Sequence, residues 1–264
     1  MLISLWPAAA LAALLLLLFA MTLKDKSDYA RFKLARGTGA RRAFYRQWIM
    51  LCWILFGLGG LGILAALGAT DALVVFPSEF AALDLRRSAE VPPLAGMGLS
   101  TMLGIATGLA LGAVISAVVW RWRLAPTKPP VIGDIEPLLP REKGEYPYTA
   151  ALSITAGVTE ELFFRLTLPL LAYAATGSAL AGFVIAGAAF GLMHWYQGWT
   201  GVIATTLVGT LLAYLYLSSG SLIKPILVHI LIDLVALVVR PALAARASRK
   251  IAYERRQTVQ GEAS

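Results

Sequence analysis

Seven apolar runs, each close to the twenty residues that a helix needs to cross a bilayer, constrain this chain more than any other feature. Of the 264 residues, 58% are hydrophobic and only 14% are charged. In lipid the backbone must satisfy its own hydrogen bonds, and continuous runs favour helices over the alternating strands of a barrel. We therefore expect an all-α transmembrane bundle with spans at 2–23, 48–67, 94–120, 149–176, 179–196, 199–217 and 222–239.

Basic residues alternate between the segments that separate these runs. Residues 24–46 contain eight Lys and Arg, 121–146 contain five and 240–264 contain six, whereas 68–93 contain two. Positive charge marks the cytoplasmic ends of membrane helices. We therefore expect the N-terminus outside and the C-terminus in the cytoplasm. The formal charge of +8 then reflects topology, not a nucleic-acid partner.

The pattern predicts three parts. Residues 1–148 are expected to hold the first helices, a basic cytoplasmic segment that forms a short interfacial helix, and a proline-rich connector. Residues 149–240 form a second bundle, and residues 241–264 form a basic tail. Trp48 and Tyr196, at the ends of apolar runs, are expected to anchor the bundle in the headgroup region. Gly187 and Gly191 are spaced for close helix packing.

Three formal charges interrupt the fourth apolar run, in the stretch TEELFFRL at residues 159–166. On insertion scales, Glu160, Glu161 and Arg165 together cost roughly 8–10 kcal/mol unless they are paired or hydrated. Glu161 and Arg165 are four residues apart and share a helix face. Glu160 is rotated about 100° from Glu161 and has no Lys or Arg on its own face, so local pairing does not explain it.

Two further helices carry the other intramembrane polar residues. The chain has two histidines, His194 and His229, and both fall within or at the end of an apolar run. Asp233 follows His229 by four residues and shares its helix face. Such residues are rarely tolerated in apolar helices without a function. We therefore expect three helices to enclose a polar functional cavity.

Two hydrolytic chemistries fit these side chains. A carboxylate and an imidazole around a water can generate a nucleophile that attacks a carbonyl, and a second histidine can stabilise the oxyanion. Alternatively, Glu160, His194 and His229 can hold a divalent metal such as zinc. The HExxH and GxGD patterns of two other intramembrane protease classes are absent, and SSGS at 218–221 lacks the glycine that precedes a serine nucleophile. No nucleotide, haem or flavin signature appears.

Three motifs lie in order along the second bundle: EELFFR at 160–165, FGLMH at 190–194 and HILID at 229–233. They resemble the motifs of the CAAX protease and bacteriocin-processing family, intramembrane endopeptidases that are also called abortive-infection proteins. The resemblance covers residues 151–239. It implies that Glu160 and His194 activate the attacking water, while Glu161 and Arg165 support the site.

The resemblance also implies that His229 stabilises the oxyanion together with the residue at position 233. The family often has asparagine there, whereas this chain has Asp233. An ionised carboxylate would repel an oxyanion, so we expect Asp233 to orient His229 through a hydrogen bond.

We expect an intramembrane endopeptidase of the bacterial inner membrane that acts on a membrane-associated peptide or protein. The residues leave two alternatives open. One is a transporter or proton-coupled channel in which the Glu and His residues form a relay, although the chain has no internal repeat. The other is a catalytically silent scaffold or immunity-type protein that has kept the fold.

Overall fold

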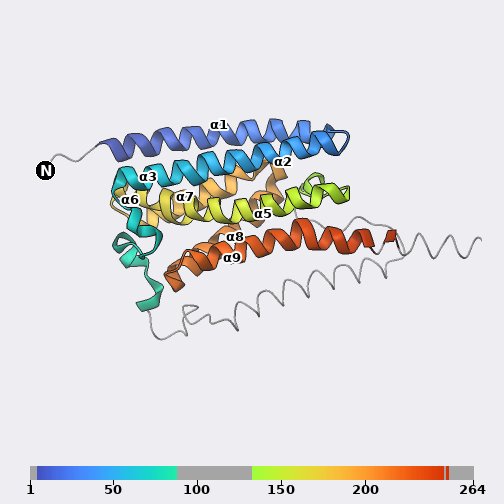
Figure 1. Ribbon diagram of the computed structural model, residues 1–264. Helices are drawn as coiled ribbons and strands as arrows, with labels where there is room; N and C mark the ends of the chain where they lie inside the picture. The colour runs from blue at the N-terminus through green and yellow to red at the C-terminus, as the bar shows by residue number, and fades with distance from the viewer. Residues whose placement is uncertain (1–4, 88–132, 247, 250–264) are drawn as a thin grey trace, which may run out of the picture.

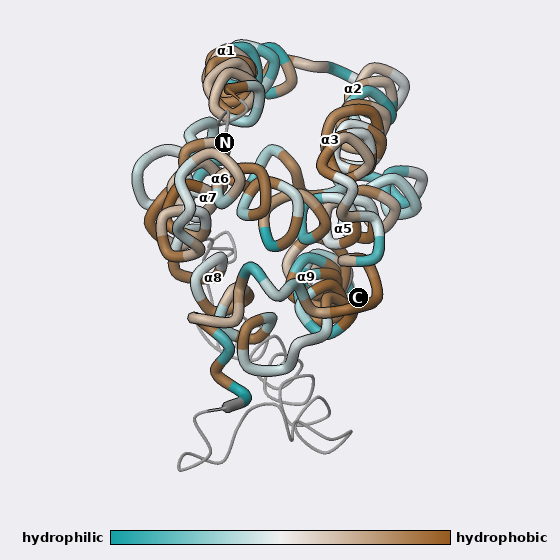
Figure 2. Tube along the Cα trace, turned by 90° about the vertical axis from the view of Figure 1, so that its left-hand side faces the viewer, coloured by the Kyte–Doolittle hydropathy of each residue, from teal (hydrophilic) through white to brown (hydrophobic). Residues whose placement is uncertain are grey.

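The computed structural model describes residues 5–87, 133–246, 248 and 249. These residues are mostly helical and contain no strand, and their long helices run side by side along one axis (Figure 1; end-on in Figure 2). The predicted all-α membrane bundle is confirmed. In this part of the chain, four helices are long and apolar enough to span a bilayer: Trp6–Leu34, Thr38–Leu67, Trp195–Ser219 and Ile223–Arg246. The span predicted at 94–120 lies outside the described residues.

We predicted a separate interfacial helix in the basic segment after the first span. Instead, this segment extends the helices on either side of it. Helix α1 (Trp6–Leu34) has 29 residues and is therefore about 43 Å long, and α2 (Thr38–Cys52) begins after a turn at Gly37, whose φ is 83°. Aromatic packing holds this hairpin together, because the rings of Phe32 and Tyr45 are buried with centroids 5.4 Å apart.

The helix that carries the charged motif is continuous but irregular. Helix α5 (Tyr146–Glu161) passes through a π-helical turn at Leu162–Thr167 into α6 (Leu168–Thr176). Helix α2 likewise passes through a π-helical turn at Trp53–Leu58 into α3 (Gly59–Leu67). The two turns pack against each other, with the rings of Phe56 and Phe163 5.1 Å apart. Turns of this kind often mark functional sites.

Three helices complete the described bundle. They are α7 (Ala179–Met193), α8 (Gly198–Ser219) and α9 (Ile223–Leu234), the last followed by a π-helical turn at Val235–Val239. Side chains at every fourth position of α8 are more than half exposed and form an apolar outer stripe suited to lipid: Trp199, Ile203, Leu207 and Leu211.

The predicted glycine packing holds at one position of α7 only. A Cβ on Gly191 would lie 2.1 Å from Thr206 Oγ1, so this glycine lets α7 and α8 approach closely. A Cβ on Gly187 would meet no atom of the described residues within 4 Å, so no close packing of this glycine is seen in that part of the chain.

The connector at residues 133–145, which precedes α5, is held against α2 at one end of the bundle (Figure 1). The Lys and Arg residues of segment 24–46 lie at the same end, which is therefore the basic end. Arg41 is buried, and its Nε donates to both carboxylate oxygens of Glu145, at 3.0 and 3.1 Å. Its Nη2 donates to the carbonyl oxygens of Pro137 and Leu139 at 2.9 and 3.0 Å. The chain that follows residue 132 is thereby held over this end of the bundle.

Candidate active site

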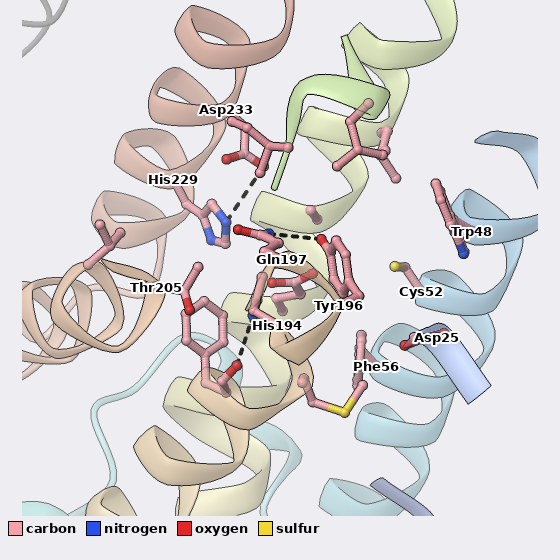
Figure 3. A pocket seen from close by; sticks show the side chains of 18 of the residues that line it. Asp25, Trp48, Cys52, Phe56, His194, Tyr196, Gln197, Thr205, His229 and Asp233 are labelled. Carbon is pink, nitrogen blue, oxygen red and sulfur yellow. Dashed lines mark hydrogen bonds and ion pairs between the residues drawn. The ribbon is translucent and has the colours of Figure 1, made fainter. Parts of the chain in front are cut away.

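A cavity of about 270 Å³ lies among the helices toward the basic end of the bundle (Figure 3). This volume is near the lower end of the range for ligand pockets. Helices α1, α2, α5, α7, α8 and α9 and the connector all contribute to its walls. Four of the six predicted site residues line it: Glu160, His194, His229 and Asp233.

The other two predicted residues, Glu161 and Arg165, form a buried ion pair that does not line the cavity. Arg165 Nε lies 3.0 Å from Glu161 Oε2, and both side chains are at most 3% exposed. Arg165 Nη2 donates to the carbonyl oxygen of Gly209 at 3.3 Å, and the guanidinium lies 4.5 Å from the centroid of the Phe190 ring. Arg165 therefore links the helix of the charged motif to α7 and α8, and its charge is neutralised where no water reaches it.

Glu161 also holds His229 across the bundle. Its Oε1 lies 2.7 Å from His229 Nδ1. A carboxylate accepts hydrogen bonds only, so Nδ1 carries a proton and the ring of His229 is held in one orientation. One buried carboxylate thus joins Arg165 of its own helix to His229 of α9.

The position of Asp233 differs from the one expected. We expected Asp233 to orient His229, but the orienting hydrogen bond comes from Glu161, and Asp233 Oδ2 lies 3.8 Å from His229 Nε2. That distance is too long for a hydrogen bond but short enough for an ion pair. A doubly protonated His229 would satisfy both neighbours, with Nδ1–H on Glu161 and Nε2–H directed toward Asp233 and the cavity (Figure 3).

Glu160 lines the cavity and Glu161 does not, because adjacent side chains point about 100° apart around the helix axis. Its Oε2 is buried and has no hydrogen-bond partner among the described residues. A buried carboxylate oxygen without a partner is costly. Glu160 therefore presents an unused acceptor to whatever occupies the cavity.

His194 closes the end of α7 and presents the second acceptor. Its Nδ1 lies 2.8 Å from the carbonyl oxygen of Phe190 (Figure 3). Since a carbonyl oxygen only accepts, Nδ1 carries the proton and Nε2 keeps its lone pair. The ring stacks on Tyr196 with centroids 6.0 Å apart, which restrains its plane.

The side chains considered for zinc are those of Glu160, His194 and His229. Among the residues that the structure describes, no group of three or more His, Cys, Asp or Glu side chains is arranged to hold a metal ion. Nδ1 of His194 is engaged by the Phe190 carbonyl and Nδ1 of His229 by Glu161, so only Nε2 of each ring is left for a ligand in the cavity.

The cavity also contains residues that the sequence reasoning did not place there. Trp48 and Tyr196 line it, so the prediction that they anchor the bundle in the headgroup region misses their contact with the site. Asp25 of α1 and Gln197, just after α7, line it as well. Their positions depend on how helices far apart in sequence pack, and only the formal charge of Asp25 near an apolar run gave a local signal.

Comparison with known proteins supports the resemblance seen in the three motifs. The family model described as type II CAAX prenyl endopeptidase Rce1-like matches residues 143–235, about a third of the chain, and this segment contains all three motifs. The resemblance to this protease family is thereby confirmed for that segment. Searches of curated proteins and of solved structures find no significant match.

Proposed function

We propose, from the match of residues 143–235 to the type II CAAX prenyl endopeptidase Rce1-like family, that this integral membrane protein is an endopeptidase. Its substrate is a membrane-associated peptide or protein, and a water in the cavity is the nucleophile. The observation that carries the proposal is the pair of acceptors on one cavity: Glu160 Oε2, which has no partner among the described residues, and the Nε2 lone pair of His194.

In the proposed first step, the water donates one O–H group to Glu160 and the other to His194. Glu160 takes a proton as the water oxygen bonds to the carbonyl carbon, and the carbonyl electron pair moves onto oxygen. The Nε2–H of His229 then donates to the oxyanion, while Glu161 keeps the ring in place.

In the second step, the tetrahedral intermediate collapses and breaks the C–N bond. Glu160 returns its proton to the leaving nitrogen, so one water is consumed and a carboxylic acid and an amine are formed. Asp233 stays within ion-pair distance of His229 and balances its charge. The Glu161–Arg165 pair holds this arrangement from behind the wall of the cavity.

We further propose that the protein resides in the inner membrane of a bacterium with the basic end of the bundle in the cytoplasm. The basic residues before α2, in the connector and after α9 lie at that end (Figure 1), in keeping with the positive-inside rule. Substrates would then be cut near the cytoplasmic face.

The test compares cleavage of membrane-anchored peptides by the wild-type protein and by Glu160→Gln, which keeps the shape of the side chain but not its basicity. We expect kcat to fall by roughly 10²–10⁴-fold, the contribution of a general base, with an unchanged elution volume and melting temperature. Glu79→Gln makes the same chemical change outside the cavity and should cleave like the wild type. Full activity in Glu160→Gln, or no cleavage by the wild type, would overturn the proposal.

A chelator arm separates the two hydrolytic chemistries. Cleavage that resists chelation supports water activated by Glu160 and His194. Cleavage that is lost on chelation and restored by zinc would require a metal instead.

A further inference from the structure

Helices outside the family match supply one wall of the cavity. Asp25 of α1 and Trp48 of α2 line the side opposite His229 and Asp233 of α9 (Figure 3). The proposed hydrolysis uses neither Asp25 nor Trp48. A carboxylate placed in the wall of an otherwise largely apolar cavity therefore calls for a role of its own.

Two contacts of α1 with the end of α7 determine where Asp25 lies. Thr22 is buried, and its Oγ1 lies 3.2 Å from the sulfur of Met193. Seven residues further along α1, the ring of Tyr29 packs on Tyr196 with centroids 4.9 Å apart. Asp25 lies between these contacts, three residues after one and four before the other, so it shares their helix face and is directed toward the segment that contains His194.

The cavity wall carries more acidic than basic side chains. Three carboxylates line it, those of Asp25, Glu160 and Asp233, and no Lys or Arg among the described residues does. Two basic residues flank Asp25 in sequence. Lys24 pairs with the buried carboxylate of Asp28, and Lys26 Nζ lies 4.8 Å from the centroid of the Trp195 ring. No hydrogen bond or ion pair joins Asp25 to another described side chain. This side of the wall thus offers a carboxylate to a cation.

We propose that Asp25 is a specificity-determining residue that receives the ammonium or guanidinium of a Lys or Arg side chain close to the scissile bond of the substrate. The indole of Trp48 lines the same wall, and an aromatic ring attracts such a cation. The preferred substrate is therefore a peptide segment that carries a basic residue. This inference rests on the proposed peptidase function.

The experiment uses membrane-anchored peptides with blocked termini, in which one position at a time around the cleavage site is lysine, norleucine or glutamate. Norleucine matches the length of the lysine side chain without its charge. For the wild type we expect kcat/KM to be about tenfold higher with lysine than with norleucine at one position, as for a partly buried ion pair, and lowest with glutamate. Asp25→Asn should bring the lysine to norleucine ratio close to one, and Asp25→Lys should make glutamate the preferred residue.

Asp71→Asn provides the matched control, because Asp71 is exposed in the turn at Thr70–Leu73, away from the cavity, and its loss should leave the ratios unchanged. Cleavage with no preference for lysine, or with a preference that Asp25→Asn retains, would overturn this inference and leave the peptidase function standing.

If no peptide is cleaved, the peptidase function fails and a binding measurement decides the role of Asp25. The lysine and norleucine peptides are then titrated against wild-type protein and Asp25→Asn in detergent micelles. Tighter binding of the lysine peptide that disappears in Asp25→Asn supports a cation subsite, and equal binding of both peptides refutes it.

Discussion

Replacing Glu161 by glutamine leaves a buried guanidinium without the carboxylate that neutralises it. Arg165 Nε and Glu161 Oε2 lie 3.0 Å apart, and neither side chain is more than 3% exposed. Removing one partner of such a buried pair costs about 3–5 kcal/mol, because the remaining charge stays in a medium of low dielectric. The polar glutamine amide remains beside Arg165, so we expect a value near the lower end, about 3 kcal/mol.

A double-mutant cycle separates the pair from its surroundings. Glu161→Gln, Arg165→Met and the double variant are unfolded reversibly in mixed detergent micelles, and the free energies of unfolding are compared. Because the double variant contains neither charge of this pair, we expect it to be at least about 2 kcal/mol more stable than the sum of the single effects predicts.

The control is the pair of Lys33 and Asp134, whose side chains are 39% and 45% exposed. Its removal should cost at most about 1 kcal/mol, because water screens the charges. If Glu161→Gln costs no more than Asp134→Asn, or if the cycle shows no coupling, the buried network does not stabilise the bundle and the reasoning is refuted.

Two further substitutions test the packing around the site. A Cβ on Gly157 would lie 2.4 Å from Ile230 Cγ1, between α5 and α9, so Gly157→Ala should lower the free energy of unfolding by about 1–3 kcal/mol. Gly187→Ala should not lower it, because a Cβ there would meet no atom of the described residues within 4 Å. Arg41→Ala should remove the partner of Glu145 and lower the free energy of unfolding by about 3–5 kcal/mol. It should also expose the connector before α5 to limited proteolysis. Arg41→Lys keeps the charge and should lower the free energy of unfolding by less. Equal stability of the two glycine variants, or an Arg41→Ala connector that resists protease, would contradict these expectations.

The sequence alone determined the class of fold and the helices that carry the chemistry. Transfer of an apolar run into lipid depends on about twenty consecutive residues, so four of the seven spans, those that begin the chain and end it, could be found without knowing their neighbours. Helix periodicity likewise predicted that Glu160 lies on a different face from Glu161 and Arg165. The structure keeps that division, with Glu160 on the cavity and the pair behind its wall.

The tertiary structure decided which residues of different helices meet. Glu161, not Asp233, holds His229 through a contact that joins positions 68 residues apart. The basic segment after the first span lengthens α1 and α2, which brings Asp25 and Trp48 into the same cavity. Helical periodicity says which side chains share a face of one helix, but the rotation and depth of each helix against the others follow from packing in three dimensions.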